Sequence, residues 1–166
     1  MIEHRSRYHV DAPRQVVWRA LHPKPPTDPR PGPRVIEYDG GRIEILEEGD
    51  EAGQGLVRIC TFGVPSYLLS GGRAMSWECV TEARLYELSR YVAIGKPLWS
   101  RAEGHHELVD APQGGCELTF YESYHAFNPV LRALLESRVH RFISHHNDLT
   151  YRTVLGFCGT VTRLDA

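Results

Sequence analysis

The feature that most constrains the fold is a long helical pattern at the C-terminal end of the chain. Asn128 stands where an N-cap is expected, Pro129 follows at the first helical position, and apolar residues recur at helical spacing up to residue 157. At about 1.5 Å per residue, this helix is about 45 Å long and crosses a small domain. Its expected apolar face consists of Leu131, Leu135, Val139, Phe142, Leu149 and Phe157.

Polar side chains interrupt this apolar face. Arg138, His146, Thr150 and Thr153 fall on the face or beside it. A helix that only seals a dry core carries aliphatic residues at such positions, because a buried polar group without a partner is costly. The pattern therefore indicates a helix that covers a cavity.

The composition is that of an ordinary globular domain. A length of 166 residues with 42% hydrophobic and 24% charged residues fits a single domain over residues 1–166. The net charge of −2 gives no electrostatic reason to expect nucleic acid or an anionic membrane as a partner. No apolar run reaches the length of a membrane span, and the N-terminus lacks an apolar signal region. We therefore expect a cytoplasmic protein without membrane insertion, either a monomer or a homodimer.

Cysteine and histidine spacing argues against a metal or cofactor site. In a strand, adjacent residues such as His105 and His106 point to opposite faces, and in a helix His145 and His146 diverge by about 100°. Neither pair can chelate one ion, and we expect no metal and no cofactor. No CxxC pair occurs, so reduced, partly buried thiols are expected at Cys60, Cys79, Cys116 and Cys158.

The N-terminal part of the chain reads as a strand followed by a short helix. Residues 2–10 alternate as a strand does, and Asp11 near the N-cap with Pro13 in the first turn then opens the helix. Six prolines crowd residues 22–33, which excludes regular helix or central strand. We interpret this segment as a surface loop, with part of a pocket rim as the alternative.

The middle of the chain has the period of two that is typical of strands. The pattern predicts a hairpin of residues 42–48 and 56–62, and the predicted further strands cover residues 76–83, 86–94, 98–110 and 115–126. Short links between them favour an antiparallel meander, against whose concave face the terminal helix must pack. The prediction is an α+β fold in which a curved antiparallel sheet of about seven strands wraps around a long C-terminal helix.

In this order of elements the chain resembles the START-like superfamily, also called SRPBCC or polyketide cyclase/dehydrase-like, which has the helix-grip fold. The most specific likeness is YHVDAPRQVVWRAL at residues 8–21, a strand, an Ala-Pro turn and a helix with a Val-Trp pair. Residues 76–82 and 95–99 are similar to the family's central strands. The resemblance implies a hydrophobic cavity between sheet and helix, which in known members holds lipids, hormones or polyketides. Some members are cyclases or aromatases, but no catalytic set is shared. Where the family usually has a short second helix, this chain has its prolines.

Strand alternation predicts which side chains face the cavity. On residues 115–126 the inward set includes Phe120, Glu122 and Tyr124, and on residues 98–110 it includes His106. Trp77, Cys79 and Thr81 are the expected inward set on their strand, whereas residues 86–94 leave the choice open between Leu88, Arg90 and Val92 and the set Ser89, Tyr91 and Ala93.

These positions bring together a small polar group of residues, namely Glu122, Tyr124, His106 and His146. A buried carboxylate at Glu122 would hold a proton or find a cationic partner such as Arg90 or a histidine. Such groups can orient a ligand carbonyl, or act as acid and base in ring closure and dehydration. The alternative is that they only satisfy one another. The candidate catalytic residues are Glu122, Tyr124 and His106, and the candidate ligand-binding residues are Trp77, Arg90, Trp99, His106, Phe120, Glu122, Tyr124, Phe142, His146, Thr150 and Thr153.

Three functions are compatible with the sequence. The first is binding of a small hydrophobic, lipid- or polyketide-like ligand in the internal cavity. The second is a polyketide cyclase, aromatase or dehydratase that uses Glu122, Tyr124 and a histidine. The third is a protein-interaction module, which would show a filled interior and a large exposed apolar patch.

Overall fold

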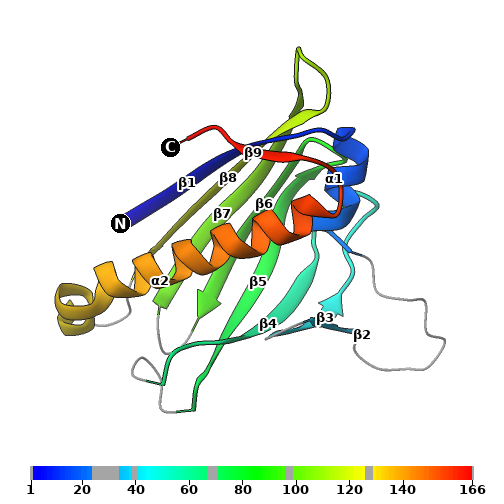
Figure 1. Ribbon diagram of the computed structural model, residues 1–166. Helices are drawn as coiled ribbons and strands as arrows, with labels where there is room; N and C mark the ends of the chain where they lie inside the picture. The colour runs from blue at the N-terminus through cyan, green and yellow to red at the C-terminus, as the bar shows by residue number, and fades with distance from the viewer. Residues whose placement is uncertain are drawn as a thin grey trace.

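The computed structural model describes residues 2–23, 34–38, 41–66, 71–95, 99–125 and 129–165. Within these residues, one antiparallel sheet curves around a long helix (Figure 1). The elements are β1 (Ile2–Val10), α1 (Arg14–Leu21), β2 (Arg34–Tyr38), β3 (Gly41–Glu47), β4 (Val57–Gly63), β5 (Arg73–Arg84), β6 (Leu88–Gly95), β7 (Trp99–Asp110), β8 (Cys116–His125), α2 (Pro129–Gly156) and β9 (Val161–Arg163).

The sheet has nine strands in the order β2-β3-β4-β5-β6-β7-β8-β1-β9, each antiparallel to its neighbours. The predicted α+β helix-grip architecture is confirmed, but the predicted count of about seven strands is too low. The two additional strands, β2 and β9, are short and form the edges of the sheet. β9 has three residues and is a strand only because the chain after α2 returns to pair with β1, which no local pattern reveals.

Helix α1 follows β1 as predicted, with a different N-terminal geometry. Pro13 is itself the N-cap residue, with φ −60° and ψ 142°, and no side chain caps the helix. The exposed side chain of Asp11 therefore does not serve as the expected cap. Most of the predicted loop over residues 22–33 lies outside the described residues. Within the described part of the chain, no helix has the length and apolar composition needed to span a membrane.

Two separate hydrophobic clusters hold α2 against the concave face of the sheet. The first joins the C-terminal end of α2, through Leu155, to α1 and to β1, β7 and β8, and contains the fully buried Tyr8 and Leu118. The second joins Val139 and Ile143 of α2 to β5, β6, β7 and β8. Because the clusters meet different stretches of the helix, the stretch between them has no continuous apolar packing beneath it.

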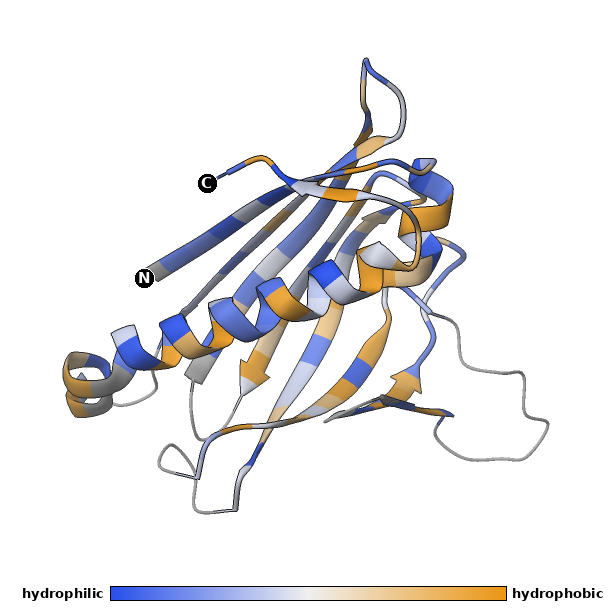
Figure 2. Cartoon of the chain, viewed as in Figure 1, coloured by the Kyte–Doolittle hydropathy of each residue, from blue (hydrophilic) through white to orange (hydrophobic). Residues whose placement is uncertain are grey.

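The face of α2 that meets the sheet matches the predicted face only in part: Val139 and Phe142 lie on it as expected. Leu149 is exposed and Phe157, just beyond the helix, keeps 86% of its surface accessible, although both were assigned to the apolar stripe. The buried side contains Val139, Ile143 and Leu155, while apolar and polar residues alternate along the whole helix (Figure 2). The side chains of Leu131 and Leu135 lie outside the described set.

A partly buried hydrogen bond fixes α2 to the N-terminal strand. The Tyr8 hydroxyl donates to Asp148 Oδ1 over 2.5 Å, and the same carboxylate forms ion pairs with Arg152 at 3.1 Å and Arg163 at 3.0 Å. Burial works to raise the pKa of Asp148, but the Tyr8 hydrogen bond and the Arg163 charge outweigh it and lower that pKa. Asp148 is therefore ionised at neutral pH and links α2 to β1 and β9.

This contact predicts a specific loss of stability. Tyr8→Phe leaves one charge-assisted hydrogen bond unmade, so the free energy of unfolding, measured by urea denaturation at pH 7, should fall by about 1.5–3 kcal/mol. Tyr121→Phe, on the outer face of β8 where the ring stacks on His105, is the matched control and should change it by less than about 0.5 kcal/mol. Equal effects of the two substitutions would contradict a docking role for Tyr8.

Candidate ligand-binding cavity

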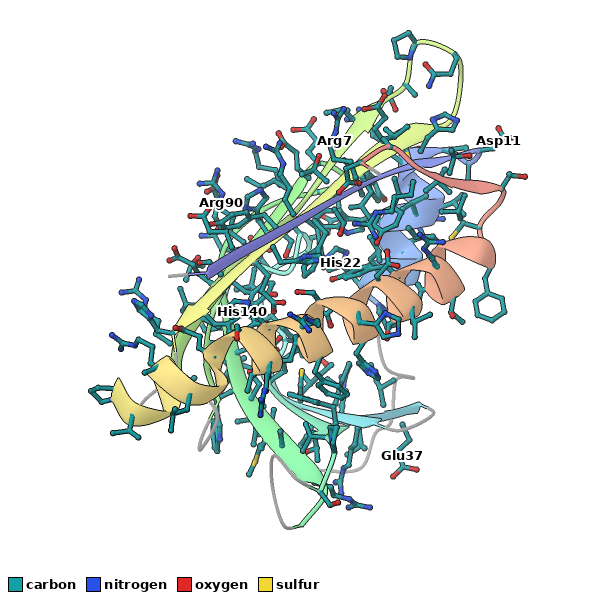
Figure 3. All side chains as sticks on the ribbon, turned by 60° about the vertical axis from the view of Figure 1, so that its left-hand side comes forward. Arg7, Asp11, His22, Glu37, Arg90 and His140 are labelled. Atoms are coloured by element: carbon teal, nitrogen blue, oxygen red, sulfur yellow. The ribbon has the colours of Figure 1, made fainter. Side chains whose placement is uncertain are left out.

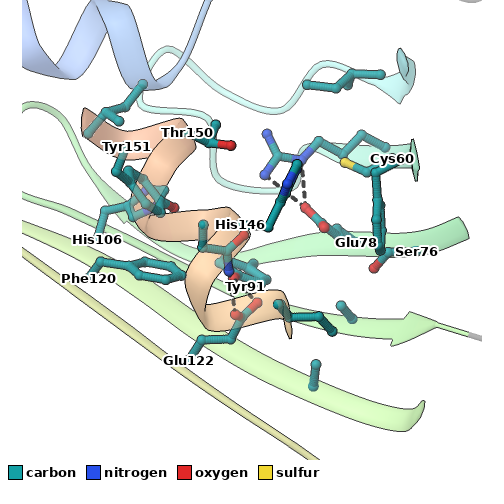
Figure 4. Close-up of a pocket in the computed structure, with 18 of the residues that line it drawn as sticks. Cys60, Ser76, Glu78, Tyr91, His106, Phe120, Glu122, His146, Thr150 and Tyr151 are labelled. Atoms are coloured by element: carbon teal, nitrogen blue, oxygen red, sulfur yellow. Dashed lines mark hydrogen bonds and ion pairs between the residues drawn. The ribbon is translucent and has the colours of Figure 1, made fainter. Parts of the chain in front are cut away.

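A cavity of about 370 Å³ lies between the middle of α2 and the sheet (Figure 4). Strands β2 to β8 line it from the sheet side, and the α2 residues in its wall are Phe142, Ile143, His146, Asn147, Thr150, Tyr151 and Val154. The opposing residues Ala93 and Ala102, which also belong to the second cluster, are small and pair directly across β6 and β7. Their short side chains leave space beneath the polar stretch of the helix.

Tyr91, Gly104 and Glu122 form one row across β6, β7 and β8 at the base of the cavity. The Tyr91 hydroxyl donates to Glu122 Oε1 at 3.2 Å, so the phenol passes over β7 to reach the strand beyond it. A Cβ at Gly104 would lie 2.5 Å from Tyr91 Oη and 2.8 Å from the Tyr121 backbone oxygen. Glycine is therefore required at position 104 for the contact to form.

Glu122 is held from the other side by α2, where Asn147 Nδ2 donates to its Oε2 over 2.8 Å (Figure 4). Burial raises the pKa of Glu122 to about 7, and the charge of Glu78 adds to this, while the hydrogen bonds from Tyr91 and Asn147 act in the opposite direction. Near neutral pH the carboxyl group is present in both forms. It can donate a hydrogen bond when protonated and accept a proton when ionised.

A second charged group in the wall is the ion pair of Arg58 on β4 with Glu78 on β5. The two residues are directly opposite in the register, and both Nε and Nη2 of Arg58 lie 2.8 Å from Glu78 Oε2. Burial alone would lower the pKa of Arg58, but the Glu78 carboxylate raises it above its ordinary value. The guanidinium thus stays charged. The neighbouring Cys60 stays a thiol, because burial raises its pKa to about 12.

The predicted orientation of β5 is wrong, because the strand turns the residues of this ion pair toward the cavity. Ser76 and Glu78 face the cavity, whereas Trp77 lies on the outer face with 50% of its surface accessible and Thr81 is also exposed. The apolar Trp77 suggested the opposite parity, but a charge that has a partner on the adjacent strand can occupy the inner face. The placement of Arg58 and Glu78 was missed. Arg58 is the single charged residue of β4, and only the pairing of β4 with β5 brings it opposite Glu78.

Two further predicted ligand-binding residues lie away from the cavity. On β6 the inward set is Ser89, Tyr91 and Ala93, so Arg90 extends outward from α2 and pairs with Glu82 at 3.1 Å (Figure 3). It is therefore not the partner of Glu122. Thr153 is on the solvent side of α2, where its hydroxyl donates to the Leu149 carbonyl oxygen at 2.9 Å. The Trp99 side chain lies outside the described set.

The remaining predicted residues do line the cavity, namely His106, Phe120, Glu122, Tyr124, Phe142, His146 and Thr150. Tyr124 stacks on the His140 ring, with 3.5 Å between centroids, and its hydroxyl donates to the His140 carbonyl oxygen at 3.4 Å. The Tyr124 hydroxyl is thus hydrogen-bonded to the backbone of α2. Tyr91, and not Tyr124, is the residue whose phenol hydroxyl contacts Glu122. His146 and Thr150 line the cavity and are also exposed to solvent, which places them at its rim.

His106 is buried and has a partner on each ring nitrogen. Nε2 lies 2.5 Å from Tyr151 Oη, and Nδ1 lies 3.3 Å from His22 Nε2. Burial, followed by the neighbouring His22, lowers its pKa well below the ordinary histidine value. The imidazole is therefore neutral over the physiological pH range.

A larger cavity of about 720 Å³ adjoins the first, beneath α1 and the hairpin between β3 and β4. The two share Leu21, Pro23, Ile36, Ile43 and Arg58 in their walls. All four cysteines are free, and within the described ranges no group of three or more His, Cys, Asp or Glu side chains is placed to hold a metal ion.

These features define the fold: it is a helix-grip architecture with a cavity beneath the C-terminal helix. No protein-family model matches the sequence, and no curated protein matches it either. Solved structures do. The crystal structure of Ara h 8.0201 aligns with a TM-score of 0.62 and 16% identity over 95% of this chain and 97% of that one. Protein CV1439 from Chromobacterium violaceum aligns with a TM-score of 0.59 and 15% identity, over 94% and 96% of the two chains.

A third structure is StfQ, a di-domain ARO/CYC protein from the steffimycin biosynthetic pathway. It aligns with a TM-score of 0.60 and 12% identity, over 95% of this chain and 50% of StfQ. The chain thus spans about half of StfQ. At these identities the likeness establishes the fold.

The pKa of Glu122 predicts an unusual pH dependence of stability. The carboxyl binds its proton more tightly in the folded state than in the unfolded state, where its pKa is about 4.5. The contribution of Glu122 to stability should therefore fall as pH rises from about 4.5 to about 7 and level off above pH 8, by up to about 3 kcal/mol at roughly 1.4 kcal/mol per pH unit. The buried histidines, whose pKa values are lowered, act in the opposite direction, so the test compares variants with the wild type. In urea unfolding between pH 5 and 7, the free energy of unfolding should rise more steeply with pH in Glu122→Gln than in the wild type. The control Glu103→Gln, on the outer face of β7, should retain the wild-type slope; the same change of slope there would refute the assignment to Glu122.

Proposed function

We propose that this protein binds a small, largely apolar molecule in the cavity beneath α2. The observation that carries the proposal is the convergence of Glu122, Tyr91 and Asn147 in a cavity whose other walls are mainly apolar. Ligand sites in proteins are typically clefts of about 300–1,000 Å³ with a few convergent polar groups that fix orientation. The present cavity has this size and this chemistry.

The polar groups restrict the kind of molecule that fits. Arg58 is neutralised by Glu78, and Glu122 is partly protonated at neutral pH, so the cavity has no unpaired positive charge among these residues that would call for an anionic ligand. A protonated Glu122 is suited to donate to a carbonyl oxygen. The fold shared with a di-domain ARO/CYC protein supports a ring-containing or polyketide-like molecule within this class. The open interior argues against the alternative of a protein-interaction module.

Blocking the cavity tests the proposal. The neutral fluorophore N-phenyl-1-naphthylamine should bind saturably to the wild type, with an emission increase on titration. Ala93→Phe places a ring in the cavity from β6, so the affinity should fall about tenfold or more. The control Val109→Phe adds the same ring at an exposed position of β7 and should bind as the wild type does. Absence of saturable binding to the wild type, or equal affinity in both variants, would refute the proposal.

The pKa of Glu122 supports a second candidate function, a cyclase or dehydratase. In that reaction the Glu122 carboxylate takes a proton from a methylene between two carbonyls, and the resulting carbanion bonds to a third carbonyl carbon. The alkoxide then recovers the proton from Glu122. The new carbon–carbon bond closes the ring, and loss of that hydroxyl with a neighbouring hydrogen, as water, forms a double bond within it. Tyr91, which lies beside Glu122, takes the place expected for Tyr124.

Turnover separates the two functions. With a synthetic poly-β-ketone thioester, a cyclase should produce an aromatic product that absorbs in the near ultraviolet and has lost one water by mass. Glu122→Gln should lower that rate by about 100-fold or more while leaving N-phenyl-1-naphthylamine binding within about twofold. Glu103→Gln should retain the full rate. A rate that is unchanged in Glu122→Gln would eliminate the enzymatic role of this residue.

A further inference from the structure

A chain of hydrogen bonds runs from α1 across β7 to α2 and ends in the cavity wall. It begins at the Trp18 carbonyl oxygen, which lies 3.0 Å from Nδ1 of His22, the C-cap residue of α1. His22 Nε2 lies 3.3 Å from His106 Nδ1, and His106 Nε2 lies 2.5 Å from Tyr151 Oη. Both His106 and Tyr151 line the cavity (Figure 4).

The Trp18 carbonyl oxygen determines which atom donates and which accepts in every hydrogen bond of this series. A carbonyl oxygen only accepts, so the proton between Trp18 and His22 is on His22 Nδ1. A neutral imidazole has one N–H, which leaves His22 Nε2 as an acceptor and makes His106 Nδ1 the donor to it. By the same rule His106 Nε2 is an acceptor. The Tyr151 hydroxyl must then donate its proton to His106.

Both imidazoles are neutral at physiological pH, as this direction requires. Burial lowers the pKa of His22 to about 4, and burial together with the nearby His22 lowers the pKa of His106 well below its ordinary value. Burial also raises the pKa of Tyr151, so the proton stays on the phenol oxygen instead of moving to His106. The chain therefore positions a proton and does not act as a base.

Aromatic packing keeps the members of the chain in place. The His22 ring lies on Trp18 with 4.1 Å between centroids, and the Tyr151 ring lies on Phe120 at 4.5 Å. His106 is itself buried between β7 neighbours and these rings. This packing opposes ring flips that would exchange the donor and acceptor nitrogens of the imidazoles.

We propose that this chain of hydrogen bonds makes Tyr151 Oη an obligate hydrogen-bond acceptor toward the cavity. The ligand then carries a hydroxyl or N–H donor at that position. The proton of Tyr151 is committed to His106, and only oxygen lone pairs remain to contact a ligand. This inference rests on the proposed binding function and adds which partner donates the hydrogen bond between the ligand and Tyr151. Tyr151 is the specificity-determining residue, and His22 and His106 are positioning residues.

A matched pair of probes tests whether the contact with Tyr151 favours a ligand that has a hydrogen-bond donor. 2-Naphthol and 2-methoxynaphthalene share a ring system, but only the first has a donor. The ratio of their affinities, in favour of 2-naphthol, should fall about threefold to tenfold from the wild type to Tyr151→Phe, the contribution of one hydrogen bond. In the control Tyr121→Phe, which removes a phenol hydroxyl from the outer face of β8, the ratio should stay within twofold of the wild type.

The outcomes separate this inference from the proposed function. If neither probe binds the wild type saturably, the binding function fails. If both bind and the ratio is unchanged in Tyr151→Phe, binding stands and the inference is overturned. A ratio that falls equally in Tyr121→Phe would also overturn it, because the discrimination would then not belong to Tyr151.

The positioning role of the histidines has its own readout. Long-range ¹⁵N–¹H correlation spectra of the histidine-labelled protein at pH 7 should show His22 and His106 as neutral Nδ1–H tautomers. In His22→Leu the constraint on His106 is removed, so its Nε2–H tautomer should appear and the probe ratio should fall toward that of Tyr151→Phe. An Nε2–H tautomer of His106 in the wild type would overturn the inference.

Discussion

The structure depends on the way α2 is attached to the sheet at two separate places. Leu155, with the Tyr8–Asp148 hydrogen bond nearby, fixes the C-terminal part of the helix, and Val139 and Ile143 fix the earlier turns. A rigid helix held at two points spans the intervening distance without following the concave sheet. The space that remains beneath it is the cavity, and its existence therefore follows from where the apolar contacts stop.

The polar groups in this space are arranged so that their burial is compensated. Arg58 has Glu78, Glu122 has Tyr91 and Asn147, and His106 has Tyr151 and His22. Each partner lies on a different element from the group that it compensates, so these contacts also tie β4, β5, β6, β7 and β8 to α2 and to the C-terminal end of α1. Compensation of this kind allows a cavity wall to contain polar side chains without losing the fold, and it gives a ligand defined donors and acceptors instead of a uniformly apolar surface.

Strand alternation located part of the site. For β8 it placed Phe120 and Glu122 on the inner face, and for β7 it placed His106 there, as the structure confirms. For β5 the same reasoning failed, because the hydrophobic Trp77 was assigned inward in place of Glu78. An ion pair between neighbouring strands reverses the usual preference, and a strand read alone does not reveal its partner's charge.

The sequence by itself determined the elements and their local faces: the strand at β1, the long helix α2, the α+β class and the alternation along β7 and β8. Backbone dihedral preferences and the periods of 2 and 3.6 residues are local properties, and a single chain segment contains them. Only the tertiary structure decided that β9 returns to β1, that Gly104 lets Tyr91 reach Glu122, and that His22 lies against His106. Those contacts join residues far apart along the chain, and their geometry depends on strand register and helix docking, which no local period encodes.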